Sequence, residues 1–278
     1  MNEKLSTEIE PLFIDSAAGR VFALYFAPHG APRGAILYLP PLAEELNRCR
    51  HLAAEQARIF AASGYACLVL DLFGTGDSAG ELADANWNIW RTDVTTAADW
   101  LEHKTGMPVT LWGLRFGALL AADIASSAPE RFSRLLFWQP VTDGKTYLTQ
   151  FLRLRIAFLM DRGLPPETTD DMRNRLKAGE PVVVSGYVLP GNLACSIDQI
   201  RLGNLANLKK IQIDWFENVS EPGKPLSIAS QKIIENMRTQ GTLINVHAFT
   251  APPIWALHER DEAPDLLSLT TEIFRGQT

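Results

Sequence analysis

The chain of 278 residues is predicted to fold as an α/β protein around a mostly parallel, doubly wound sheet of about eight strands. Three observations predict this class. Short apolar runs alternate with helical patterns along most of the sequence, and Pro and Gly mark the turns between them. The length suits a single large α/β domain. Helices then cover both faces of the sheet, and ligands bind beyond the carboxyl ends of the strands.

Residues 21–26 alternate in polarity, which is typical of an antiparallel edge strand, and residues 13–14 begin its expected hairpin partner. The later strands share uninterrupted apolar character and are expected at 35–39, 66–70, 109–112, 135–138, 211–216 and 243–248. The helices share apolar residues at helical spacing and are expected at 50–63, 89–103, 118–126, 226–238 and 264–274.

The interval 142–207 interrupts this alternation and is predicted to be a helical cap inserted after the sixth strand. Residues 1–141 and 208–278 then form the core. Within the cap, residues 151–160 carry apolar side chains at helical spacing with two arginines on another side. Two arginines are too few for stable anchoring to a membrane, so a helix that roofs the pocket is the favoured interpretation.

Composition excludes several partner classes. The net charge of −6 argues against nucleic acid, and no apolar run approaches the roughly 18 residues of a membrane span, so we expect no stable membrane insertion. The beginning of the chain lacks the apolar segment of a secretory signal. Three scattered cysteines without metal spacing favour a cytoplasmic protein with no metal. No cofactor is expected, since the Gly74-Thr75-Gly76 stretch lacks a third glycine. No pattern indicates an oligomeric state.

Residues 109–118, VTLWGLRFGA, have the layout of a nucleophile elbow: a short apolar strand, a glycine-bracketed pentapeptide and a helix of small residues. In the G-x-S-x-G pattern of α/β-hydrolases, the central residue is the attacking serine, exposed on a strained turn. Arg115 stands in that place. A guanidinium stays protonated and offers no lone pair, so Arg115 cannot attack a carbonyl carbon.

Further stretches match the same layout: DLFGTGDS at 71–78, NWNIWRTD at 86–93, PPLAEELN at 40–47 and WQPV at 138–141. With the elbow, this set resembles the exosortase A system-associated hydrolase 2 family of bacteria that make PEP-CTERM proteins and exopolysaccharide. The resemblance covers most of the chain and implies an α/β-hydrolase fold with an arginine-bearing elbow. It implies little about the reaction, because the family name rests on the fold.

The elbow predicts an anion site. The N–H of Phe116 is one expected oxyanion donor, and Leu42 supplies the second, because the two prolines before it lack an N–H. Two backbone donors, a helix N-terminus and a guanidinium all favour negative charge. Two interpretations stay open: Arg115 binds an external anion, or it pairs with Glu44 or Glu45 of the neighbouring loop. Trp87 is a further candidate for the pocket lining.

The acid of a hydrolase is expected after the strand at 211–216, where Glu217 and Glu221 lie, with Asp143 as another option. The base is expected after the last strand. His258 lies roughly where the hydrolase histidine does, although a histidine in a surface loop is the alternative; His247 is expected to be a packed or edge residue. Glu217 with His258 is the pair nominated for attack by an activated water.

Cys49 and Ser78 lie on loops that border the pocket and are the substitute nucleophiles. For both, a structural role is favoured: a small half-buried cysteine at a helix start, and a serine that serves the turn after Gly74 and Gly76.

Three functions are compatible with the sequence. The first is a hydrolase-fold protein that binds a small anionic or acyl-containing ligand, or a protein partner, without serine-hydrolase chemistry. The second is an esterase, thioesterase or acyltransferase with a displaced nucleophile or a histidine-activated water. The third is a scaffold in a protein-sorting or exopolysaccharide assembly. Arg115 at the nucleophile position favours the first, a pseudoenzyme.

Overall fold

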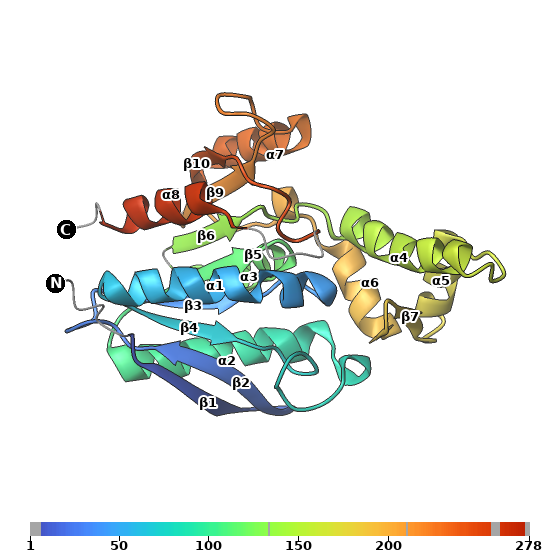
Figure 1. Ribbon diagram of the computed structural model, residues 1–278, viewed down its shortest axis with the longest axis horizontal. Helices are drawn as coiled ribbons and strands as arrows, with labels where there is room; N and C mark the ends of the chain where they lie inside the picture. Colours follow the sequence, from blue (N-terminus) through green and yellow to red (C-terminus); the bar gives the residue numbers. More distant parts are fainter. Residues whose placement is uncertain (1–6, 133, 210, 257–261, 276–278) are drawn as a thin grey trace.

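The computed structural model describes residues 7–132, 134–209, 211–256 and 262–275. Its centre is an eight-stranded sheet in the order β1-β2-β4-β3-β5-β6-β9-β10 (Figure 1). The β1–β2 and β2–β4 pairs are antiparallel, and the pairs from β4 to β10 are parallel. The predicted doubly wound, mostly parallel sheet is therefore confirmed, with the antiparallel hairpin at one edge.

The strands of this sheet are β1 (Ile9–Ser16), β2 (Gly19–Phe26), β3 (Gly34–Leu39), β4 (Tyr65–Leu70), β5 (Val109–Leu114), β6 (Arg134–Trp138), β9 (Gln212–Asn218) and β10 (Leu243–Phe249). The residues of β4 and β6 are all buried, as expected for strands covered on both faces. β2 alternates instead between buried and half-buried positions, in agreement with its predicted place near an edge.

The helices that flank the sheet are α1 (Glu44–Ala62), α2 (Trp87–Thr105), α3 (Phe116–Ser127), α7 (Ile228–Thr239) and α8 (Pro264–Arg275). α2, α3 and α7 contribute to one hydrophobic cluster, and α1 and α8 contribute to a second. The two clusters lie on opposite faces of the sheet, which therefore has a core on each side. The segment 82–84 forms a short 3-10 helix, η1.

α1 begins six residues earlier than the sequence analysis predicts, at Glu44 instead of residue 50. Its first turn carries Glu44 and Glu45, and acidic side chains there interact favourably with the helix dipole. Ala43, just before the helix, has φ 55°. The early start has a consequence for the site, because it holds Glu45 in a helix beside the end of β5.

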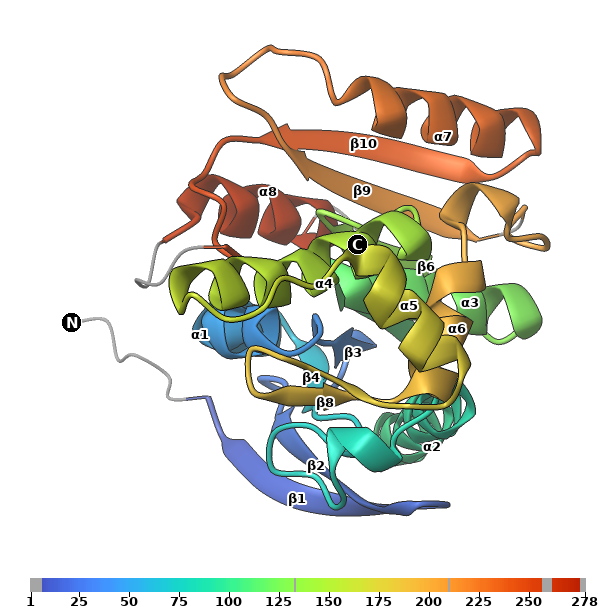
Figure 2. The ribbon, with the colours of Figure 1, turned by 90° about the vertical axis from the view of Figure 1, so that its right-hand side faces the viewer.

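The insertion after β6 contains α4 (Gly144–Asp161), α5 (Thr169–Lys177), the hairpin strands β7 (Val182–Val184) and β8 (Tyr187–Leu189), and α6 (Gly191–Gln199), followed by the short 3-10 helix η2 (Leu202–Asn204). These elements lie together over one end of the sheet (Figure 2). The predicted cap after strand 6 is thus present. It is not purely helical, because β7 and β8 pair antiparallel.

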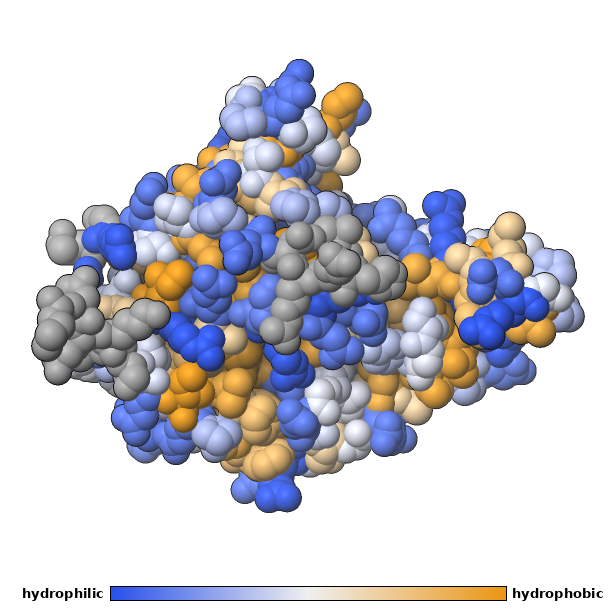
Figure 3. All heavy atoms as spheres, in the orientation of Figure 1, coloured by the Kyte–Doolittle hydropathy of each residue, from blue (hydrophilic) through white to orange (hydrophobic). Residues whose placement is uncertain are grey.

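The cap is apolar on its outer side as well as its inner side. α4 buries Tyr147, Phe151 and Leu152 but leaves Leu154 and Phe158 about half exposed. Figure 3 shows hydrophobic patches among hydrophilic ones at this end of the molecule. Within the segment 151–160, Phe151 and Leu154 line a cavity of the protein, which agrees with the predicted helix over the pocket.

Candidate functional site

The chain turns from β5 into α3 at a single residue, Arg115, with φ 55° and ψ −114°. Its N–H donates to the carbonyl of Trp138 at 2.9 Å, and its own carbonyl accepts from the N–H of Val141 at 3.1 Å. Such a positive φ is uncommon for a residue with a side chain and stores backbone strain. The predicted strained turn is present, with an arginine at its apex.

The two glycines of the elbow are required by close backbone contacts. A Cβ at Gly113 would clash with the backbone of Ala118, and a Cβ at Gly117 would clash with the carbonyl of Leu39. α3 therefore packs against β5 and β3 so closely that a side chain at either position would force them apart.

Arg115 forms an internal ion pair with Glu45. The guanidinium Nη2 lies 3.3 Å from Glu45 Oε1, and the two side chains are 15% and 21% exposed. The rings of Tyr147 and Trp255 flank the guanidinium, with centroids 6.0 Å and 5.0 Å from Cζ. Glu44, the other predicted partner, instead accepts a hydrogen bond from Tyr187 at 3.1 Å. Of the two carboxylates proposed from the sequence, the structure thus selects Glu45.

Tyr147 of α4 fills the space over the expected oxyanion donors. Its hydroxyl donates to Glu45 Oε2 at 3.4 Å and accepts from the backbone N–H of Leu42. Its ring stacks on that of Phe116, whose N–H is one of the first amides of α3, with centroids 5.6 Å apart. The Leu42 amide thus binds a tyrosine hydroxyl, and its role as an oxyanion donor stays a prediction.

Burial raises the pKa of the Glu45 carboxyl, and the neighbouring Arg115 guanidinium opposes this without cancelling it. Burial also raises the pKa of Tyr147 well above its usual range, and the Glu45 carboxylate adds to the increase. Both acids thus hold their protons more tightly than they would in water. The buried Nε of Arg115 has no hydrogen-bond acceptor within the described residues.

A cavity of about 410 Å³, here called the Glu45 cavity, opens above this cluster. The lining residues that bear on its chemistry are Leu42, Glu45, Tyr147, Phe151, Leu154 and Trp255. Most of the remaining wall is polar or charged, with Glu44, Arg48, Gln150 and Ser185, and Arg115 adjoins the cavity through its ion pair with Glu45 without being part of the lining. Such a cavity suits a ligand with a short apolar body and one polar end.

Of the nominated acid and base, only Glu217 lies among the described residues. His258 falls at 257–261, outside the described residues. Glu217 is buried in β9, where Oε2 accepts from the indole of Trp215 at 2.9 Å and Oε1 accepts from the N–H of Ser227 at 3.1 Å. Both carboxylate oxygens therefore support local structure, and Glu217 does not line the Glu45 cavity.

The other candidates also have structural partners. Asp143 accepts from the N–H of Thr146 and caps α4, and Glu221 lies 3.8 Å from Lys224. His247 stacks on Phe216, and its Nε2 lies 3.3 Å from Asp214.

Trp87, expected as a pocket residue, is buried. Its indole N–H donates to Asp123 at 2.8 Å, and its ring packs against Phe116. It is absent from the lining of the Glu45 cavity because α2 directs it into the core.

The substitute nucleophiles have the structural roles that the sequence favoured. Cys49 is buried within α1, and burial raises its pKa to about 12. Ser78 donates to the carbonyl of Asp71 and accepts from the N–H of Phe22, both at 2.7 Å. A buried thiol that keeps its proton is a poor nucleophile, and so is a hydroxyl that is engaged in two hydrogen bonds.

Two residues of the site were not anticipated. Tyr147 and Trp255 come from the cap and from the loop after β10, far from the elbow in sequence. No motif marks either of them. The one signal that the sequence did offer for the site concerns Glu45. Acidic residues are favourable in the first turn of a helix, so the start of α1 could have been placed to include Glu45.

The described residues contain no group of three or more His, Cys, Asp or Glu side chains arranged to hold a metal ion. Within the same ranges, no helix has the length and apolar character needed to span a bilayer.

Comparison with known proteins places this site in a family. Residues 30–177, more than half of the chain, match the family Hydrolase_4, described as serine aminopeptidase, S33. The mitochondrial palmitoyl-protein thioesterases ABHD10 of Rattus norvegicus and Pongo abelii are each 30% identical over 122 residues. The match covers 44% of this chain and only 38% and 37% of those proteins.

Solved structures agree on the fold. Alpha/beta hydrolase domain-containing protein 10 from mouse has a TM-score of 0.64 at 15% identity, covering 97% of this chain and 100% of that one. A thermostable carboxyl esterase from Bacillus coagulans has a TM-score of 0.66 at 14% identity, covering 98% of both chains. At such identities the likeness shows the fold alone. The parallel sheet, the elbow turn and the matched family together show that the chain belongs to Hydrolase_4, within the α/β-hydrolase superfamily.

Proposed function

We propose that this protein is a cytoplasmic pseudoenzyme of the exosortase A system-associated hydrolase type, which binds a small anionic or acyl-containing ligand in the Glu45 cavity. The observation that carries the proposal is Arg115 at the apex of the elbow, ion-paired with Glu45, which lines the cavity. A guanidinium there cannot form an acyl-enzyme, but it can bind a carboxylate or a polarised carbonyl oxygen.

Internal groups already occupy the positions that such a ligand would use. Glu45 supplies the carboxylate on Arg115, and the Tyr147 hydroxyl supplies the oxygen on the Leu42 amide. A ligand carboxylate would replace Glu45 on the guanidinium, and its second oxygen would replace the tyrosine hydroxyl. Its apolar tail would lie along Phe151 and Leu154.

This exchange links anion binding to proton uptake. A displaced Glu45 carboxylate beside a bound anion would be repelled by it, so the pKa of Glu45 would rise further and the residue would take up a proton. We therefore expect one proton to be bound with each carboxylate, and anion affinity to increase as the pH falls.

The test is calorimetric titration with octanoate and with its neutral analogue 1-octanol. We expect octanoate to bind at least about tenfold more tightly than the alcohol, which corresponds to about 1.4 kcal/mol. Arg115→Ala should abolish this preference, whereas Lys232→Ala, at an exposed position on α7, should leave it unchanged. Equal octanoate binding by the parent and Arg115→Ala would contradict the proposal.

The second candidate is an esterase, thioesterase or acyltransferase that uses a displaced nucleophile or an activated water. The relatives named palmitoyl-protein thioesterase favour it. On this hypothesis His258 is the base and Glu217 the acid that orients it. Saturable hydrolysis of a short acyl thioester that is lost in His258→Ala would support it. Labelling by a fluorophosphonate probe would identify a displaced serine; absence of both turnover and labelling would reject it.

A further inference from the structure

A second cavity lies on the other side of the β7–β8 hairpin tip. It encloses about 400 Å³, and we call it the Glu81 cavity. Ser185 lines the Glu45 cavity, and the next two residues, Gly186 and Tyr187, line the second one. The Tyr187 hydroxyl bonds both Glu44 and Asn47 of α1, so the hairpin tip is fastened between the two cavities. No lining residue is shared by the two cavities.

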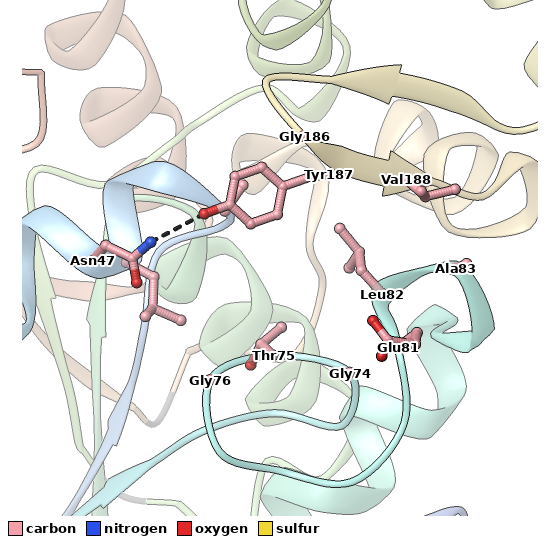
Figure 4. Close-up of a pocket in the computed structure, with 12 residues that line it drawn as sticks. Asn47, Gly74, Thr75, Gly76, Glu81, Leu82, Ala83, Gly186, Tyr187 and Val188 are labelled. Carbon is pink, nitrogen blue, oxygen red and sulfur yellow. Dashed lines mark hydrogen bonds between the residues drawn. The ribbon is translucent and has the colours of Figure 1, made fainter.

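Asn47, Thr75 and Glu81 each bring an acceptor oxygen to the lining of the Glu81 cavity. Figure 4 shows Asn47, Thr75, Glu81 and Tyr187 around one space, from α1, the loop after β4, the start of η1 and β8. The Asn47 amide nitrogen is used on Tyr187, which leaves its carbonyl oxygen available. The Thr75 hydroxyl donates a hydrogen bond to the carbonyl of Leu72 at 2.8 Å, so it can only accept further hydrogen bonds.

Glu81 gives this cavity its charge. Its side chain is exposed, and it has no ion-pair partner among the described residues. It is the only charged residue in the described lining. The Tyr187 hydroxyl donates to Glu44 and accepts from Asn47, so it has little capacity left for a ligand. A ligand must therefore supply donors and, for the best match, a positive charge.

We propose that the Glu81 cavity binds a primary ammonium group carried on a short aliphatic stem. An ammonium has three donors and no acceptor, which suits a cavity lined by the acceptor oxygens of Thr75 and Glu81, with Asn47 across the space (Figure 4). A hydroxyl would bring lone pairs that find no donor side chain, and a carboxylate would be repelled. The aliphatic stem would contact Leu46, Leu82 and Val188 of the lining. A lysine side chain and a free alkylamine share this chemistry.

The proposal goes beyond the function proposed for the Glu45 cavity and does not depend on it. The probe is n-hexylammonium, measured by calorimetry against 1-hexanol and hexanoate. We expect the ammonium to bind about tenfold more tightly than the alcohol. Glu81→Gln should remove most of this preference, about five- to tenfold. Glu55→Gln, at an exposed position of α1 outside the cavity, should not change it.

Arg115→Ala should leave hexylammonium binding unchanged, so failure of one proposal is distinguished from failure of the other. Nα-acetyl-lysine methylamide is compared with hexylammonium on the same variants; sensitivity of either to Glu81→Gln supports the ammonium class, and the tighter one indicates the source. Equal affinities for ammonium and alcohol, or equal effects of Glu81→Gln and Glu55→Gln, would overturn the proposal. Because Glu81 and Glu55 are exposed, circular dichroism should show both glutamine variants to be folded like the parent.

Discussion

The Glu45 and Glu81 cavities have nearly the same volume, and the tip of the β7–β8 hairpin separates them. They differ in whether their charged side chains have partners within the protein. In the first, Glu45 pairs with Arg115 and accepts from Tyr147, and these three side chains are largely withdrawn from solvent. In the second, the carboxylate of Glu81 and the neighbouring hydrogen-bond acceptors are accessible to a ligand. A ligand of the proposed kind would therefore have to displace internal partners in the Glu45 cavity, whereas in the Glu81 cavity Glu81 has no ion-pair partner to displace among the described residues.

The largest expected effect comes from the elbow glycine. Gly117→Ala places a methyl group against the carbonyl of Leu39, so α3 must move away from β3. Overpacking of this kind costs about 3 kcal/mol in the free energy of unfolding. Urea denaturation should show this loss, and octanoate binding should weaken while hexylammonium binding persists.

Gly203→Ala is the matched control, because its new Cβ would meet only ordinary van der Waals neighbours. An equal loss of stability in both variants would show that the close approach of α3 does not hold the elbow in place.

The next effect concerns the ion pair. Arg115→Met leaves the Glu45 carboxylate without its cation. Loss of one partner of a fully buried pair costs 3–5 kcal/mol, and the partial exposure of this pair reduces the expectation to about 2 kcal/mol near neutral pH. The loss should shrink in acid, where Glu45 is protonated. Denaturant melts at about pH 5 and about pH 7.5 test this, with Lys232→Met as control; a loss independent of pH would exclude Glu45 as the cause.

The pH dependence of the parent follows from the raised pKa of Glu45. The folded protein holds this proton more tightly than the unfolded chain, so the stabilisation is complete below the unfolded-state pKa. It is lost as the pH rises through the folded-state pKa. Glu45→Gln resembles the protonated form. Its free energy of unfolding should equal that of the parent at about pH 4 and exceed it progressively as the pH rises.

The same variant should bind octanoate more tightly near neutral pH, because Arg115 is then released from its internal carboxylate. Glu44→Gln is the control, since Glu44 lies in the same helical turn but bonds Tyr187 instead. A parent more stable than Glu45→Gln at every pH would show that the ion pair outweighs the burial of the carboxyl.

The smallest expected effect is that of the tyrosine hydroxyl. Tyr147→Phe removes one hydrogen bond to Glu45 and frees the Leu42 amide, at a cost of about 1 kcal/mol. Octanoate affinity should rise severalfold. Tyr65→Phe removes a buried hydroxyl that bonds the carbonyl of Phe274, away from both cavities, and should lower stability without changing affinity. Unchanged octanoate binding in Tyr147→Phe would mean that the hydroxyl does not compete with the ligand.

The sequence predicted the sheet and its flanking helices well, because uninterrupted apolar strands such as β4 and apolar residues at helical spacing are local patterns. The elbow was equally visible, since the clashes at Gly113 and Gly117 leave a signature in residue type. The division into a core and a cap domain at residues 142 and 207 stays a prediction.

The side-chain contacts within the site were harder to predict from the sequence. Pairing of Arg115 with one of two adjacent glutamates depends on the rotation of α1, which its unrecognised first turn determines. Tyr147 reaches the Leu42 amide only because the cap folds back over the sheet, a long-range contact without local pattern. Trp87 shows the opposite case. It lies in one of the stretches that match the hydrolase layout and was expected in the pocket, but its side chain is directed into the core.

The elbow conformation does not depend on the side chain at its apex. Its bent backbone is fixed by the packing of α3 on two strands and by hydrogen bonds to Trp138 and Val141, none of which involves the side chain at the apex. Relaxing the turn would therefore mean dislodging a whole helix. The scaffold therefore holds residue 115 in the same place whichever side chain it carries. A change of one codon can exchange the chemistry of that side chain while the position of the residue is preserved.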